Sequence, residues 1–293
     1  MSSLAAVIDA HTHMFSAEVH RARESLLERE PWFGMLYTNP TAKLATDEEL
    51  IRASVDAGVD RVIACGFPWR DLGRCRAENA AFADAARAHP QLSWMAIVPP
   101  HAGASAAQEL DRAFSAGACA LGELNADAQG WELADPSSLA PVIEVCLAHD
   151  RPVLLHASEP VGHSYPGKGM ATPDRLLAFL SAFPSVKVVL AHWGGGLPFY
   201  ELMPEVADLC RNVTYDTAAS TYLYRPEVFR AVVDIIGPDR VLWGSDFPVL
   251  GMAKFLRRTR ESSGLLPAEL PPILSANAAR VYRLPLHHGA HTA

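Results

Sequence analysis

The chain has 293 residues, with 25 Lys and Arg against 33 Asp and Glu, which gives a formal net charge of −8. This acidic balance argues against a nucleic-acid-binding surface. No apolar run approaches the roughly 18–20 residues that a membrane span needs, and the first residues lack the basic flank of a signal peptide. The five cysteines form no Cys-x-x-Cys pair, so we expect a reducing, cytoplasmic compartment and neither a membrane nor a nucleic acid as partner.

Eight short apolar runs recur along the chain, and helical patterns separate them. The runs are rich in Val, Ile, Leu and Ala, which is typical of parallel strands buried on both faces. From the second run onward their spacing is close to the roughly thirty residues of a βα unit. The alternation predicts an α/β fold, a (β/α)8 barrel of the TIM type, with a doubly wound open sheet as the alternative. The predicted strands are Ala5–Ala10, Arg61–Cys65, Leu92–Val98, Ala118–Leu124, Pro152–His156, Val186–His192, Val213–Thr217 and Arg240–Ser245.

The predicted helices fill the intervals between these runs and support a single domain over residues 1–293. A long insertion, residues 14–46, follows the first strand; it either covers the barrel mouth or packs as a surface helix with a charged face over Arg21–Glu30. Leu270–Leu284 reads as a helix that closes the barrel, and residues 285–293 as a flexible tail. The other helices are expected at Asp47–Ala57, Cys75–Ala88, Ala104–Ala116, Leu139–His149, Pro173–Ala182, Glu201–Arg211, Pro226–Ile236 and Met252–Ser262.

Residues that bind divalent metals stand at the C-terminal ends of five predicted strands. Side chains alternate along a strand, so the first two of them, which are one residue apart, point to the same side. The carboxyl ends of barrel strands converge on one mouth, where four histidines and two carboxylates together match a site for one or two divalent ions. Any one of them alone would be a hydrogen-bonded histidine or a helix cap. The six are His11, His13, Glu123, His156, His192 and Asp246.

Four segments together resemble the amidohydrolase superfamily, and more narrowly its amidohydrolase-related branch of metal-dependent barrel hydrolases and decarboxylases. The resemblance covers nearly the whole chain, because the segment Asn277–Tyr282 is similar to the usual C-terminal helix of that branch. It is specific to the superfamily and not to a substrate. The segments are Asp9-Ala-His-Thr-His13, His156, His192-Trp-Gly-Gly-Gly196 and Trp243-Gly-Ser-Asp-Phe-Pro248.

The resemblance implies roles for these residues. His11 and His13 would bind the first ion, and His156 would bind that ion or a second one. His192 would be a ligand in a two-ion site, or a free acid/base and oxyanion stabiliser in a one-ion site. Asp246 would contact the metal and accept the proton of its bound water, whose pKa a divalent ion lowers to roughly 7.

Two departures from the family pattern bear on the reaction. Many superfamily members place a carboxylated lysine on the fourth strand to bridge two ions, whereas this chain has Glu123. This glutamate either bridges two ions unaided, or supports a metal ligand, or binds substrate. Decarboxylases of the branch often replace part of the His-x-His pair with glutamate. Because both histidines are present here, the sequence favours hydrolysis without excluding decarboxylation.

Loop residues after several strands are candidates for substrate binding. Cationic and phenolic side chains would suit a carboxylate or another anionic group, and two tryptophans would provide flat apolar walls. Each of them could equally serve loop packing or carry a solvated charge. The donors are Arg70, His163, Tyr165 and Lys168, and the walls are Trp69 and Trp193.

From these observations we predict a metal-dependent hydrolase that uses metal-activated water on an ester, lactone or amide of a small, carboxylate-bearing molecule. A metal-dependent decarboxylase is the first alternative, and a non-catalytic metal- or ligand-binding barrel is the second. We expect zinc, as one or two ions, with manganese or another divalent ion as alternatives. The resemblance also implies a homodimer.

Overall fold

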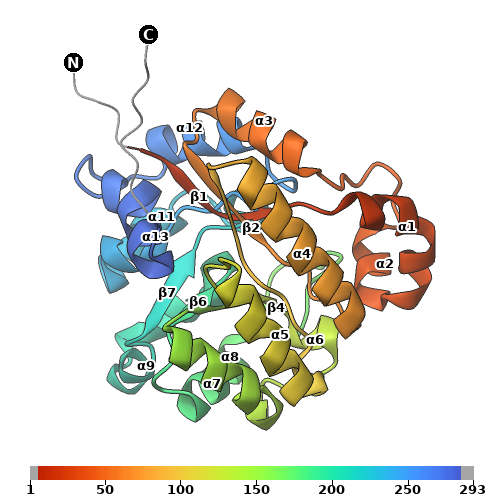
Figure 1. The fold of residues 1–293 in the computed structure, drawn as a ribbon. Coiled ribbons are helices and arrows are strands. Elements are labelled where there is room, and N and C mark those ends of the chain that lie inside the picture. The colour runs from red at the N-terminus through yellow and green to blue at the C-terminus, as the bar shows by residue number, and fades with distance from the viewer. Residues whose placement is uncertain (1–5, 285–293) are drawn as a thin grey trace.

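The computed structural model describes residues 6–284, in which parallel strands alternate with helices (Figure 1). Every predicted strand is present, although most are shorter than expected because the regular pairing ends before the turn begins. The predicted tail, residues 285–293, lies outside the described residues. The strands are β1 Ile8–His13, β2 Arg61–Cys65, β3 Leu92–Trp94, β4 Leu121–Leu124, β5 Val153–Leu155, β6 Val188–Leu190, β7 Val213–Asp216 and β8 Val241–Leu242.

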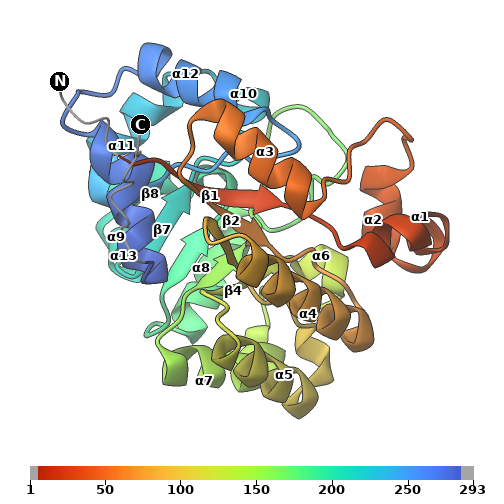
Figure 2. The same ribbon diagram turned by 45° about the horizontal axis from the view of Figure 1, so that its top comes forward.

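The strands pair in chain order, as two sheets whose edges meet. One sheet has the order β1-β2-β3 and the other β4-β5-β6-β7-β8, and each pairing within them is parallel. Parallel bridges join Ala96 to Leu121 and Thr12 to Phe247, so the edges of the two sheets contact each other on both sides. Helices surround the strands in both views (Figures 1 and 2). The (β/α)8 prediction is thereby confirmed, and the open sheet is excluded.

Helices occupy the predicted intervals, and local chemistry sets several of their ends. At α3, Thr46 accepts a hydrogen bond from the backbone of Glu49, whose side chain accepts one from the backbone of Thr46. The same helix ends at Gly58, whose φ of 68° is a left-handed conformation that glycine adopts without strain. The helices that follow the strands are α3 Asp47–Ala57, α4 Leu72–Ala88, α5 Ala104–Ser115, α7 Ala140–His149, α8 Pro173–Ala182, α11 Val228–Ile236 and α12 Met252–Ser262.

The helix expected at Glu201–Arg211 is wrong in its first part. A 3-10 segment, His192–Leu202, comes first, and the α-helix begins only at Pro204 and ends at Leu209 (α9). Proline is favoured at the first position of a helix because its missing N–H has no partner there in any case.

The insertion after β1 forms two helices, α1 (Ala17–Arg29) and α2 (Pro31–Tyr37), at one side of the barrel (Figure 2). α1 is largely a surface helix, with Val19 and Leu26 buried. α2 is anchored by Phe33, whose buried ring lies 5.6 Å from that of Phe67 and 5.3 Å from that of Trp69, measured between centroids.

The C-terminal segment covers the end of the barrel that is remote from the strand carboxyl ends. A π-helical turn, Pro272–Ala276, leads into α13 (Asn277–Tyr282), so the predicted closing helix is present but shorter and less regular. Tyr282 is fully buried and belongs to the same apolar cluster as Ile8, Ile63 and Leu154 of the strands. This packing explains why an apolar helix follows the last βα unit.

Two further predictions concern the chain as a whole. All five cysteines are free and buried, and the absence of a disulfide agrees with the reducing compartment expected from the sequence. No helix in the described part of the chain combines the length and the apolar character that crossing a bilayer requires.

Candidate metal centre and active site

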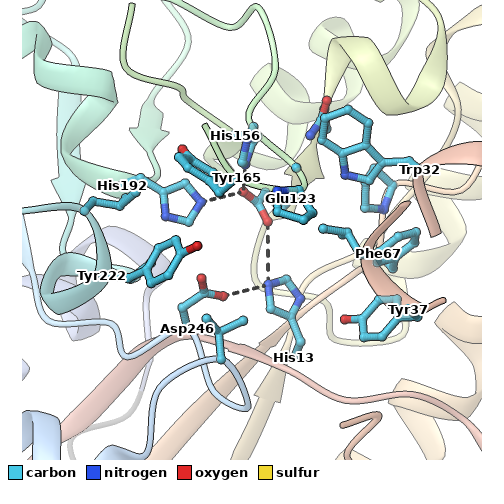
Figure 3. Close-up of a pocket in the computed structure, with 18 residues that line it drawn as sticks. His13, Trp32, Tyr37, Phe67, Glu123, His156, Tyr165, His192, Tyr222 and Asp246 are labelled. Atoms are coloured by element: carbon cyan, nitrogen blue, oxygen red, sulfur yellow. Dashed lines mark hydrogen bonds and ion pairs between the residues drawn. The ribbon is translucent and has the colours of Figure 1, made fainter. Parts of the chain in front are cut away.

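The six residues predicted from the sequence as metal ligands come together at the carboxyl ends of the strands. Figure 3 shows five of them, all except His11. His11 and His13 lie on the same side of β1, with ring centroids 5.0 Å apart, as the alternation of side chains predicts. Asp246 and His192 follow β8 and β6 in left-handed backbone conformations, with φ of 64° and 55°. Both side chains point toward the centre of the site in Figure 3.

One group of potential ligands consists of His11, His13 and Asp246. The Nε2 atoms of the two imidazoles are 3.1 Å apart, and Oδ1 of Asp246 lies 3.3 Å from Nε2 of His13 and 3.8 Å from Nε2 of His11. Two ring nitrogens and one carboxylate oxygen thus face a single point.

The second group consists of Glu123, His156 and His192, and Glu123 connects it to the first. Oε1 of Glu123 lies 2.8 Å from Nδ1 of His156 and 3.5 Å from Nε2 of His192. Oε2 of the same carboxylate faces the other group, 3.5 Å from Nε2 of His11 and 3.6 Å from Nε2 of His13. The carboxylate is therefore placed to contribute one oxygen to each of two ions.

The protonation states of the two buried carboxylates suit a cation. Burial by itself raises the pKa of Glu123, but the neighbouring imidazoles, with His11 first, hold that pKa well below its usual range. Burial likewise raises the pKa of Asp246. The hydrogen bond from His13 and the charges of His11 and His192 outweigh this effect, so the pKa of Asp246 lies below its usual value. Both side chains are therefore ionised, and hard-to-borderline divalent ions prefer a set of imidazole nitrogens and carboxylate oxygens.

Asp216, at the end of β7, supports this centre although the sequence analysis did not single it out. Its fully buried carboxylate accepts a hydrogen bond from Nδ1 of His11 at 2.8 Å, which leaves Nε2 of His11 free as a metal ligand. Its other oxygen accepts from the backbone N–H groups of His192 and Ala218, both at 3.0 Å. One carboxylate thereby fixes ligands from both groups. Its position at a strand end is the signal that could have identified it.

Replacing Asp216 with Asn should weaken metal binding by about tenfold to a hundredfold, the usual effect of losing a carboxylate that orients a ligating histidine. The amide can still contact the backbone N–H groups, but its NH2 opposes the Nδ1–H of His11. The dissociation constant for Mn²⁺ or Zn²⁺ by competition with a chelating dye tests this. Asp208→Asn, at an exposed position, is the matched control, and equal affinities of both variants and the wild type would contradict the proposed role.

A cavity of about 370 Å³ opens onto the two ligand groups. Its walls are mainly apolar and aromatic, and α2 forms part of them, so the insertion borders the site, as one of the two readings of the sequence expected. Among the described residues that line it there is no Lys or Arg. Five of the candidate ligands line it: His13, Glu123, His156, His192 and Asp246. The other lining residues are Trp32, Leu36, Tyr37, Phe67, Pro68, Asn125, Tyr165, Pro166, Gly167, Ala219, Tyr222, Leu223 and Val249.

Of the six predicted substrate-binding residues, only Tyr165 lines this cavity. Neither predicted tryptophan forms a wall of the cavity, because both side chains are fully buried. Trp69 packs against Phe67. Trp193 donates a hydrogen bond to Ser220 and packs on Phe229.

The predicted cationic residues also lie outside this cavity. The side chain of Arg70 is exposed, next to Gly130. His163 and Lys168 line a neighbouring cavity of about 280 Å³, which shares Tyr165 and Leu223 with the first. Sequence reasoning placed these residues on the correct loops, but it could not tell which way each loop turns its side chains.

A family model described as amidohydrolase matches residues 8–284. A curated relative, the 6-methylsalicylic acid decarboxylase of Penicillium expansum, is 33% identical over 97 residues, which covers 27% of this chain and 29% of that protein. The chain thus matches less than a third of the length of that relative.

Solved structures with the same fold include further decarboxylases. The 5-carboxyvanillate decarboxylase of Sphingomonas paucimobilis superposes with a TM-score of 0.77 at 18% identity, covering 97% of this chain and all of the other. The manganese complex of the enzyme from Novosphingobium aromaticivorans gives 0.76 at 18% identity, with 97% of each chain covered. The 2,6-dihydroxybenzoate decarboxylase from Rhizobium gives 0.74 at 17% identity, with 96% and 99% covered. At these identities the superpositions establish the fold. The family model covers all of the described residues except the first two. This chain therefore belongs to the amidohydrolase family.

Proposed function

We propose that this protein is a metal-dependent decarboxylase that releases the carboxyl group of a small hydroxylated aromatic acid as carbon dioxide. The observation that carries the proposal is the contrast within the cavity: aromatic and apolar walls surround one charged end, which is the cluster of candidate metal ligands. A flat ring fits between such walls, and its carboxylate would meet the cluster. The named activities of the relatives above, on 6-methylsalicylic acid and 2,6-dihydroxybenzoate, support the same substrate class.

In decarboxylation, His11, His13 and Asp246 would hold the divalent ion. Glu123, His156 and His192 are placed to hold a second ion, which hydrolysis would use. A bound ion would neutralise the substrate carboxylate and a neighbouring ring oxygen and so orient both. Manganese and zinc both suit this donor set; the relatives with bound manganese favour manganese for this chain over the zinc expected from the sequence.

The reaction needs a proton as well as a position for the carboxylate. Cleavage of the carbon–carbon bond leaves its electron pair on the ring carbon, which must take up a proton: ArCO2⁻ + H⁺ gives ArH + CO2. Asp246 is placed to carry this proton: its ionised carboxylate would first take it from solvent and then pass it to the ring carbon. The side chain of Asp246 lines the cavity. Its Oδ1 faces the imidazoles of His11 and His13. Its other oxygen has no hydrogen bond to the residues drawn in Figure 3. His192, which also lines the cavity, is held by Asp216 and Ala218 and can support Asp246 in proton transfer.

Hydrolysis remains a second candidate because of one observation. Glu123 divides its two oxygens between the two ligand groups, and a carboxylate that bridges two ions is typical of centres that hold a hydroxide for attack on a carbonyl. In that case Asp246 would accept the proton of the attacking water. The third reading, a non-catalytic binding barrel, predicts that neither reaction occurs.

One experiment separates these functions. Metal-loaded protein is incubated with carboxyl-¹³C-labelled 6-methylsalicylate and 2,6-dihydroxybenzoate, and headspace mass spectrometry follows ¹³CO2. In parallel, aryl esters and lactones are incubated in H2¹⁸O, and incorporation of ¹⁸O into the product acid is measured. Release of ¹³CO2 without ¹⁸O incorporation is the expected result. Incorporation of ¹⁸O without ¹³CO2 would replace the proposal by hydrolysis.

A further inference from the structure

We propose that the phenols of Tyr37 and Tyr222 determine specificity, by donating hydrogen bonds to uncharged oxygen groups of a substrate that carries a single carboxylate. The inference rests on the proposed function in that it places the substrate ring in the cavity beside the ligand cluster. It goes beyond it by assigning two binding residues and by excluding substrates with a second negative charge.

Tyr37, at the end of α2, presents a fixed hydroxyl to the cavity. Its ring packs against Phe33, Phe15 and Phe67, with centroid distances of 4.7, 5.4 and 6.1 Å, so its position is set by an aromatic cluster. The hydroxyl points into the cavity in Figure 3, and it has no hydrogen-bond partner among residues 6–284. Burial, with the charges of Asp246 and Glu123, raises the pKa of this phenol, so it stays protonated and able to donate.

Tyr222, on the short helix α10 (Ser220–Leu223), lies across the cavity from Tyr37 in the same view, and its hydroxyl also points inward (Figure 3). Its ring makes edge contacts with Tyr165 and His163, at centroid distances of 5.7 and 5.3 Å. Tyr165 differs from both, because its hydroxyl already donates to Oε2 of Glu159 at 2.9 Å. Of the three tyrosines that line the cavity, two therefore have a donor left for a ligand.

The charges around the cavity limit what else a substrate can carry. Within the described lining, the only positive charge available to an anion would come from the metal centre and its histidines. Lys168, in the neighbouring cavity, donates to the backbone oxygens of Val161 and His163. A second carboxylate would find only neutral donors such as the two phenols, beside apolar walls that include Phe67 and Leu223. No cation would pair with it there, and burying an unpaired charge is costly.

Isothermal titration of the metal-loaded protein with five probes tests the inference: benzoate, the three monohydroxybenzoates and isophthalate. We expect at least one hydroxybenzoate to bind more tightly than benzoate, and Tyr37→Phe or Tyr222→Phe to weaken it by roughly threefold to tenfold, the range for one hydrogen bond. Benzoate affinity should not change in these variants. Tyr200→Phe, at an exposed position outside this cavity, is the matched control and should leave both affinities unchanged. Isophthalate should bind more weakly than benzoate.

Three results would overturn the inference. Isophthalate could bind as tightly as the best hydroxybenzoate; both tyrosine variants could leave hydroxybenzoate binding unchanged or weaken benzoate equally; or none of the five probes could bind. The readout is binding and not turnover. Hydroxybenzoates bound through these phenols without release of carbon dioxide would support the inference while contradicting the proposed function.

Discussion

Replacing Asp246 with Asn should lower the rate of carbon dioxide release by about a hundredfold to ten-thousandfold, the usual contribution of a positioned proton carrier. Asparagine keeps the size of the side chain and an oxygen that can face His13, but it cannot carry the proton that the ring carbon needs. The change should leave the fold intact, because the backbone N–H of Asp246 still donates to the carbonyl of His11. The measurement is single-turnover ¹³CO2 release, with metal content determined on the same sample.

Metal retention decides how that result is read. Loss of turnover with the metal still bound supports proton transfer by Asp246, whereas loss of both would assign it chiefly to metal binding. Asp56→Asn, an exposed substitution of the same chemistry, should keep full activity. Unchanged turnover in Asp246→Asn would exclude the proposed role in decarboxylation and in hydrolysis alike.

Replacing Glu123 with Gln should weaken binding of Mn²⁺ or Zn²⁺ by about a hundredfold or more, at or beyond the upper end of what losing a supporting group costs. The substitution removes a negative charge whose oxygens lie within 3.6 Å of imidazole nitrogens from both ligand groups. The amide offers one oxygen, so it can face only one group. Plasma mass spectrometry after dialysis gives the number of ions per chain, and competition titration gives their affinity.

The number of ions in the wild type separates the two candidate reactions. If the wild type holds two ions per chain and Glu123→Gln holds one or none, this carboxylate bridges the ions and hydrolysis is favoured. One ion in the wild type would leave Glu123 and His192 free to act on the substrate, as decarboxylation allows. Glu144→Gln, exposed on α7, is the control and should match the wild type. A Glu123→Gln variant with unchanged affinity and stoichiometry would remove Glu123 from the centre.

Much of the fold could be predicted from local patterns in the sequence. Strands buried on both faces require continuous apolar runs, and β5 and β6, for example, lie within the runs that predicted them. The metal-binding set was predictable for a related reason. In a barrel, all strand carboxyl ends meet at one mouth, so His11 and Asp246 had to become neighbours once the strands were located, although more than two hundred residues separate them.

The remaining features depended on the paths of loops and on packing between distant segments. Trp193 directly follows His192, a candidate metal ligand, yet its ring lies in the core against Phe229, on a left-handed backbone with φ of 57°. Tyr37 belongs to an insertion, and only its contacts with other aromatic rings bring its hydroxyl to the cavity. Asp216 supports His11 only because β7 is close to β1 across the barrel mouth. The sequence alone thus determined which residues stand at the strand ends, because strand periodicity is local. Only the tertiary structure decided which loop side chains face the cavity, because their direction is set by contacts with residues far away in the chain.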